Sequence, residues 1–144
     1  MPDTIHLVKL CVGATSVEDL QDWQASRAAR GQDGLPVHVT RMWPRRADAL
    51  LQGGSLYWVI RGQILVRQRV MRLDQRTSGD GVRRCAIVLD PDLRRTRPAP
   101  RRPFQGWRYL YPSEAPADLS RNATRDEERL PAALEAALSE LGVH

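Results

Sequence analysis

The stretch that most constrains the fold of this chain is GGSLYWVIRGQILVRQRVMRLD, residues 53–74. Gly53 and Gly54 end the preceding element of secondary structure, and a long run of β-branched, aliphatic and aromatic residues follows. One break, at Arg61-Gly62-Gln63, divides the run into two halves. We therefore expect a hairpin or a bent pair of strands at the centre of the fold, with Leu56, Trp58 and Ile60 on one face.

The second half of this run also carries positive charge. Arg67 and Arg69 are two positions apart, so in a strand their side chains project from the same face. The aliphatic residues Ile64, Val66 and Val70 would occupy the opposite face. The run is thus predicted to form the core and to present cations to a partner.

Charge is distributed unevenly along the chain. The 144 residues have a net charge of +5, but residues 41–110 hold sixteen arginines against five acidic residues, a local net charge of +11. Residues 1–40 and 111–144 have net charges of −2 and −4. A local excess of this size attracts polyanions. Pairing of the arginines with the acidic ends of the same chain is the alternative.

The remaining elements are predicted from the periodicity of apolar residues and from the glycines and prolines that interrupt it. Strands are expected at residues 5–12, 37–42 and 82–89, and a short helix after Pro44. Ser16 is a typical N-cap, and the helix that follows it should direct Val17, Leu20 and Trp23 toward the sheet. A last strand or aromatic loop is expected at residues 104–111.

Two later segments complete the predicted domain. Residues 90–103, DPDLRRTRPAPRRP, should form a loop or an extended arm with polyproline character, because four prolines exclude a helix. A closing helix is expected at about residues 131–141. The order of elements predicts one α+β domain over residues 1–144, with a small curved mixed sheet or β-barrel and helices at its margins.

Several classes of protein are not expected. No apolar run reaches the roughly 20 residues of a membrane span, and no secretory signal is recognisable. With Cys11 and Cys85 as its only cysteines, the chain should be cytoplasmic and keep both as thiols. His6 and His38 lack metal-binding spacing, so we predict neither a metal nor a cofactor.

Three segments resemble the uncharacterised bacterial family called domain of unknown function 1489. They are HLVKLCVGATSVEDL, TRMWPRRADALLQGGSLYWVIRGQILVRQRV and RRCAIVLDPDLRRTRPAPRRPFQGWRYL, and the likeness extends to about Leu119. This resemblance implies no activity.

A second resemblance rests on the segments LLQGG, SLYWVI and GQILVRQRVMRL, which look like the PUA-like superfamily and its ASCH branch. In that superfamily a small β-barrel carries RNA, and some members process modified nucleosides. The branch's amidohydrolases use a Lys/Thr/Glu set, of which Lys9 and Thr40 are the candidates here, far apart in sequence. No glutamate lies between Asp19 and Glu114. The resemblance therefore implies RNA binding.

Our leading hypothesis is a domain that binds RNA or a modified nucleotide. Arginines would contact phosphates, and Tyr57 or Trp107 would stack on a base. The predicted surface consists of Arg41, Tyr57, Arg67, Arg69, Arg101, Arg102, Trp107 and Arg108. Two alternatives are a hydrolase of a small nucleoside-like substrate, with Lys9 and Thr40 in a pocket, and a non-catalytic interaction module. The sequence does not specify the ligand or the oligomeric state.

Overall fold

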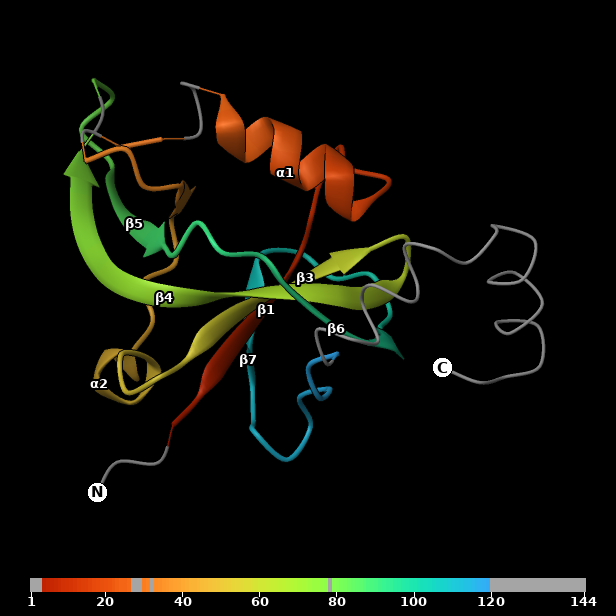
Figure 1. Ribbon diagram of the computed structural model, residues 1–144. Coiled ribbons are helices and arrows are strands. Elements are labelled where there is room, and N and C mark those ends of the chain that lie inside the picture. Colours follow the sequence, from red (N-terminus) through yellow and green to blue (C-terminus); the bar gives the residue numbers. More distant parts are fainter. Residues whose placement is uncertain (1–3, 27–29, 32, 78, 120–144) are drawn as a thin grey trace, which may run out of the picture.

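A computed structural model describes residues 4–26, 30–31, 33–77 and 79–119 of the chain (Figure 1). The strands form an open, curled mixed sheet with two helices in the described part, which confirms the α+β class. The elements, in order, are β1 (His6–Leu10), α1 (Val17–Ala25), β2 (Val37–Thr40), α2 (Ala47–Leu50), β3 (Ser55–Ile60), β4 (Gln63–Thr77), β5 (Arg83–Leu89), β6 (Arg94–Pro100) and β7 (Trp107–Leu110).

The sheet is built around the long strand β4. Its strand order is β2-β5-β4-β3-β1-β7, and only the β1–β3 pair is parallel. The first half of β4 pairs with both β3 and β6, and the second half pairs with β5. Figure 1 shows β4 as one long bent ribbon that both halves of the sheet share. Residues 53–74 therefore are the central stretch that the sequence indicates.

The turn between β3 and β4 explains why these strands form a hairpin. Arg61 and Gly62 both have positive φ angles, 53° and 80°. Two-residue hairpin turns with positive φ at both positions match the right-handed twist of the strands they join. Arg61 is the only residue other than glycine with a positive φ among the described residues, so the hairpin imposes this conformation on it.

The two faces of β3 contribute to two apolar clusters. Leu56, Trp58 and Ile60 belong to the main core, which also contains Val17 and Leu20 of α1 and Ala49 and Leu50 of α2. Tyr57 and Val59 belong to a smaller cluster on the other face, against which Phe104 and Ala115 pack. The alternation predicted for this strand is confirmed.

Helix α1 begins as the sequence predicts but presents a different face to the sheet. The Asp19 amide donates to Ser16 Oγ at 3.1 Å, which confirms Ser16 as the N-cap. Val17, Leu20 and Gln24 are buried, whereas Trp23 is 56% exposed. Trp23 lies at the edge of the buried stripe because Gln24 occupies the inner position. The prediction that Trp23 faces the core is therefore wrong.

The proline-rich segment is a strand for half of its length. Residues Arg94–Pro100 form β6, which pairs antiparallel with β4, as in Ile64↔Ala99 and Arg67↔Arg94. The register shifts between Ile64 and Val66, and a proline is tolerated at such an irregularity because no ladder bond requires its missing N–H. This half of residues 90–103 is extended, as one of the two expectations had it, but it is paired with the sheet and is not a free arm. The expected helix at residues 131–141 lies outside the described residues.

Candidate functional site

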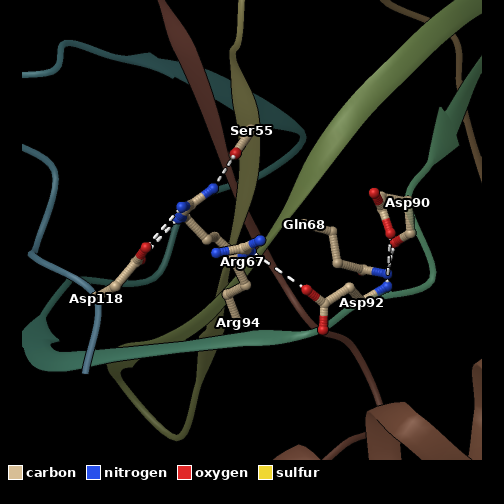
Figure 2. A network of polar contacts seen from close by, with 7 residues as sticks. All are labelled: Ser55, Arg67, Gln68, Asp90, Asp92, Arg94 and Asp118. Carbon is tan, nitrogen blue, oxygen red and sulfur yellow. Dashed lines mark hydrogen bonds and ion pairs between the residues drawn. The ribbon is translucent and has the colours of Figure 1, made fainter. Parts of the chain in front are cut away.

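Three arginines of neighbouring strands line a hollow of about 460 Å³. Arg67 and Arg69 come from β4, and Arg94, the register partner of Arg67, comes from β6. Figure 2 shows Arg67 and Arg94 close together beside Asp92 and Asp90, which also line the hollow. The side chains of Arg67 and Arg69 therefore line the same hollow, as their spacing in β4 predicts.

The chain's own carboxylates balance much of the charge in this arginine hollow. Arg67 donates from Nε and Nη2 to the two carboxylate oxygens of Asp118, at 2.7 and 2.6 Å, and from Nη1 to Ser55 Oγ at 2.8 Å (Figure 2). These hydrogen bonds lower the pKa of Asp118 and raise that of Arg67. Arg94 pairs with Asp92 at 3.2 Å. The chain's own carboxylates therefore pair with Arg67 and Arg94, which leaves less of the positive charge of this hollow for an anionic ligand.

A second group of arginines lies in the segment between β2 and α2. Residues 41–46, RMWPRR, here called the basic loop, contain Arg41, Arg45 and Arg46, all of them exposed. Met42 and Trp43 are also exposed, at 49% and 42%. The predicted surface included Arg41 but not Arg45 and Arg46, although arginines on both sides of the Trp43-Pro44 pair are visible in the sequence.

Two aromatic residues of β7 fix the basic loop in place. Trp107 Nε1 donates to the Met42 carbonyl at 2.8 Å. The Tyr109 hydroxyl accepts hydrogen bonds from the backbone amides of Arg45 and Arg46, at 2.8 and 3.1 Å. The two rings contact each other edge to face, with centroids 4.9 Å apart. The loop is therefore held at both ends by one strand that lies more than sixty residues away in sequence.

The predicted stacking residues do not present a ring to solvent. Tyr57 is 4% exposed and packs edge-on against His6, and Trp107 is 5% exposed beneath the basic loop. A base could reach neither ring face without disrupting the core. The assignment of Tyr57 and Trp107 as stacking residues is therefore corrected: Tyr57 is a core residue, and Trp107 positions the loop.

The remaining predicted arginines gather around Phe104. The guanidinium groups of Arg101 and Arg108 lie over its ring, 5.9 and 5.1 Å from the centroid. The Arg101 amide donates to the Gly62 carbonyl at 2.8 Å, which places this Phe104 cluster beside the β3–β4 turn. Arg102 is exposed next to it. Cation–π contact leaves the charge of both guanidinium groups available to an anion.

Other arginines of the cationic middle are paired with carboxylates. Arg72 contacts Asp33 at 2.6 Å and Asp74 at 2.9 Å. Further pairs within the described residues are Arg84–Asp80 and Arg95–Glu18. Twelve of the sixteen arginines of residues 41–110 thus lie in the hollow, the basic loop, the Phe104 cluster or these ion pairs. The other four are Arg61, Arg76, Arg83 and Arg97. The arginines of the predicted surface therefore do not all line one hollow.

Comparison with family profiles decides the relationship of this chain to known proteins. The profile described as "Protein of unknown function (DUF1489)" matches residues 7–144, nearly the whole sequence. The chain belongs to this family. Neither the curated proteins nor the solved structures contain a match to it.

In this DUF1489 chain, the two candidate catalytic residues are not brought together. Lys9 lines a cavity of about 220 Å³ beneath α1, and Thr40 is not among the residues that line it. Thr40 Oγ1 instead accepts a hydrogen bond from the Met42 amide at 3.4 Å, at the start of the basic loop. The cavity that Lys9 lines is therefore not lined by the second residue of the predicted pair.

The cysteines of this DUF1489 chain are both free, as predicted. Burial raises the pKa of the Cys11 and Cys85 thiols to about 11, so both are protonated at neutral pH. The described residues contain no group of three His, Cys, Asp or Glu side chains that would hold a metal ion. They also contain no helix with the length and apolar character needed to cross a membrane.

Proposed function

We propose that this DUF1489 protein binds single-stranded RNA through the basic loop. The observation that supports this most directly is the attachment of residues 41–46 to β7 by the three hydrogen bonds of Trp107 and Tyr109. A loop held in this way presents its arginines on a backbone that is already ordered, which reduces the entropy cost of binding. The ligand class follows from the side chains that this loop exposes.

The basic loop combines the two chemistries that unpaired RNA requires. Its three arginines supply donors to phosphate oxygens, and no carboxylate among the described residues pairs with them. Trp43 adds an exposed indole on which a base can stack. It takes the stacking role that the sequence hypothesis gave to Tyr57 and Trp107.

Two further features support the proposal. The Phe104 cluster carries three further cations, Arg101, Arg102 and Arg108, which add to the attraction of the protein for a polyanion. The resemblance of the β3–β4 region to the PUA-like superfamily, whose barrel carries RNA, points to the same ligand. We propose in the same terms a PUA-like arrangement of the curled sheet and a cytoplasmic location.

The test is fluorescence anisotropy with a labelled single-stranded RNA of mixed sequence at several salt concentrations. If about three phosphates are contacted, the slope of log K against log salt is about −2, because each contact on a single strand contributes about −0.7. Arg45→Gln/Arg46→Gln should weaken binding and reduce the magnitude of this slope by about 1.4. Trp43→Ala should weaken binding about tenfold or more with the slope unchanged.

The matched control removes the same charge elsewhere. Arg76 and Arg83 are exposed near the far ends of β4 and β5, and R76Q/R83Q lowers the net charge by the same two units. The control should bind nearly as the unaltered protein does. If both double variants lost the same RNA affinity, the loss would come from the lower net charge and not from the basic loop. Absence of RNA binding by the unaltered protein at low salt would contradict the proposal.

A further inference from the structure

The cavity beneath α1 has a mixed lining that the proposed RNA surface does not use. It has a volume of about 220 Å³ and lies against β1, β2, β3, β5 and α1. Most of the lining is apolar or aromatic, and Lys9 is its one charged side chain. We refer to it as the α1 cavity. Its lining comprises Lys9, Leu10, Cys11, Val12, Leu20, Trp23, Gln24, Val37, His38, Trp58 and Leu89.

We propose that the α1 cavity binds a small aromatic carboxylate, with the ring among the apolar side chains and the carboxylate on the Lys9 ammonium group. This site is separate from the basic loop and does not depend on RNA binding. Such pockets usually combine an apolar wall with a few polar groups that fix the orientation of the ligand. Lys9 is the group that selects an anion here.

The charge of the cavity indicates a single negative charge on the ligand. No carboxylate among the described residues forms an ion pair with Lys9. His38 adds no second cation, because burial lowers its pKa to about 4 and keeps it neutral at pH 7. Asp19 lines only an adjoining groove, where Thr15 donates to its carboxylate from both N and Oγ1. A lone ammonium group is therefore the partner that a monoanion needs.

The volume sets the size of the ligand. A cavity of about 150 Å³ accommodates benzene. The α1 cavity, at about 220 Å³, therefore has room for one aromatic ring with a carboxylate substituent. A complete nucleotide is larger than this space, so the site is not a second place for the RNA chain.

Two details of the lining fit a bound ligand. His38 Nε2 is buried and has no hydrogen-bond partner within the described part of the chain, a state that costs free energy until a polar atom meets it. Trp23, which the sequence placed in the core, lines both the cavity and an adjoining groove of about 300 Å³ and is 56% exposed. The groove gives a small molecule a route into the cavity.

The test uses the fact that Lys9 is the only lysine of the chain. Reductive methylation with ¹³C-formaldehyde labels Lys9 and the N-terminal amine and keeps both charges. Titration with benzoate should shift the Lys9 dimethylammonium signal and saturate, with a Kd of about 1 mM for a ligand of this size. The N-terminal signal should stay in place. Benzamide, the neutral analogue, should bind about tenfold more weakly.

Substitutions of Lys9 test whether its positive charge binds the carboxylate. Saturation-transfer NMR on the benzoate signals should show about a tenfold weaker Kd for Lys9→Gln and a smaller loss for Lys9→Arg, which keeps the cation in a bulkier side chain. The surface control Arg76→Gln should bind as the unaltered protein does. The retained charge of Lys9→Arg separates loss of the cation from loss of the fold. Equal affinity for benzoate and benzamide, or no saturation by about 20 mM benzoate, would overturn the proposal. RNA binding is measured separately, so either proposal can fail alone.

Discussion

Gln24 of α1 and Gln68 of β4 exchange two hydrogen bonds of 2.7 Å, one in each direction. Both side chains are buried. Gln68 Oε1 also accepts a hydrogen bond from Trp58 Nε1 at 2.8 Å, and its Nε2 donates to the Asp90 carbonyl at 3.0 Å. One amide thus connects α1, β3, β4 and the link between β5 and β6, which makes Gln68 the polar centre of the fold.

Replacing Gln68 by leucine should be strongly destabilising. Gln68→Leu leaves the Trp58 indole N–H and the Gln24 amide without partners, and buried unsatisfied groups cost about 1–3 kcal/mol each. We expect the free energy of unfolding to fall by about 3 kcal/mol, measured by urea denaturation. Gln24→Leu should cost less, because Gln68 keeps its bonds to Trp58 and Asp90.

The double variant and a surface control complete this experiment. The loss in Q24L/Q68L should be smaller than the sum of the single losses, because the two residues share one interaction. Gln75→Leu, at an exposed position of the same strand, should change stability by no more than about 0.5 kcal/mol. Strict additivity would mean that the two amides are not coupled.

The N-cap of α1 gives a second prediction. Ser16→Ala removes the acceptor of the Asp19 amide and should reduce the free energy of unfolding by about 1 kcal/mol. Ser16→Asp keeps an acceptor and should restore most of this loss. Thermal or urea unfolding followed by circular dichroism measures both. If Ser16→Asp lost as much unfolding free energy as Ser16→Ala, the Ser16 hydroxyl would stabilise the protein through a contact other than the N-cap.

His38 should make stability depend on pH. Burial lowers its pKa to about 4 from the ordinary 6.5, so the unfolded chain takes up a proton at a higher pH than the folded protein does. The contribution of His38 is complete above about pH 6.5 and is lost as the pH falls toward 4, by up to about 3 kcal/mol.

A variant isolates this contribution from the other titrating groups. His38→Phe keeps an aromatic ring against Trp58, whose centroid lies 5.4 Å away, and removes the titration. Its urea midpoint should fall less steeply between pH 6.5 and 4.5 than that of the unaltered protein. Burial also lowers the pKa of His6, so some dependence on pH should remain in this variant. Identical pH profiles would contradict the assignment.

Gly54 should not tolerate a side chain. A Cβ atom at this position would overlap the backbone carbonyl oxygens of Ile5 and Leu50. Because both belong to the backbone of the core, Gly54→Ala should cost about 3 kcal/mol or more. Gly79→Ala is the control, since nothing lies within 4 Å of its added Cβ. Unfolding measurements on the pair would contradict the prediction if they showed equal losses.

Local patterns predicted the elements better than the site. The Ser16 cap, the alternation of β3 and the hairpin at Arg61-Gly62 depend on neighbouring residues and could be read directly. The pairing of β6 was not predicted, because its prolines indicated an unpaired extended arm, whereas an irregular pairing with β4 accommodates Pro98 and Pro100. Tyr57 and Trp107 were assigned to the site from their residue type, and burial gave them other roles.

The sequence by itself determined the central strands, the class of the fold and the +11 charge of residues 41–110. Only the tertiary structure decided which of those charges are free. Asp118 neutralises Arg67 across fifty-one residues, while Trp107 and Tyr109 hold the basic loop away from the ion pairs. The physical reason is that a charge interacts over a few ångströms of space, and strand pairing and curvature set those distances, whatever the separation along the chain.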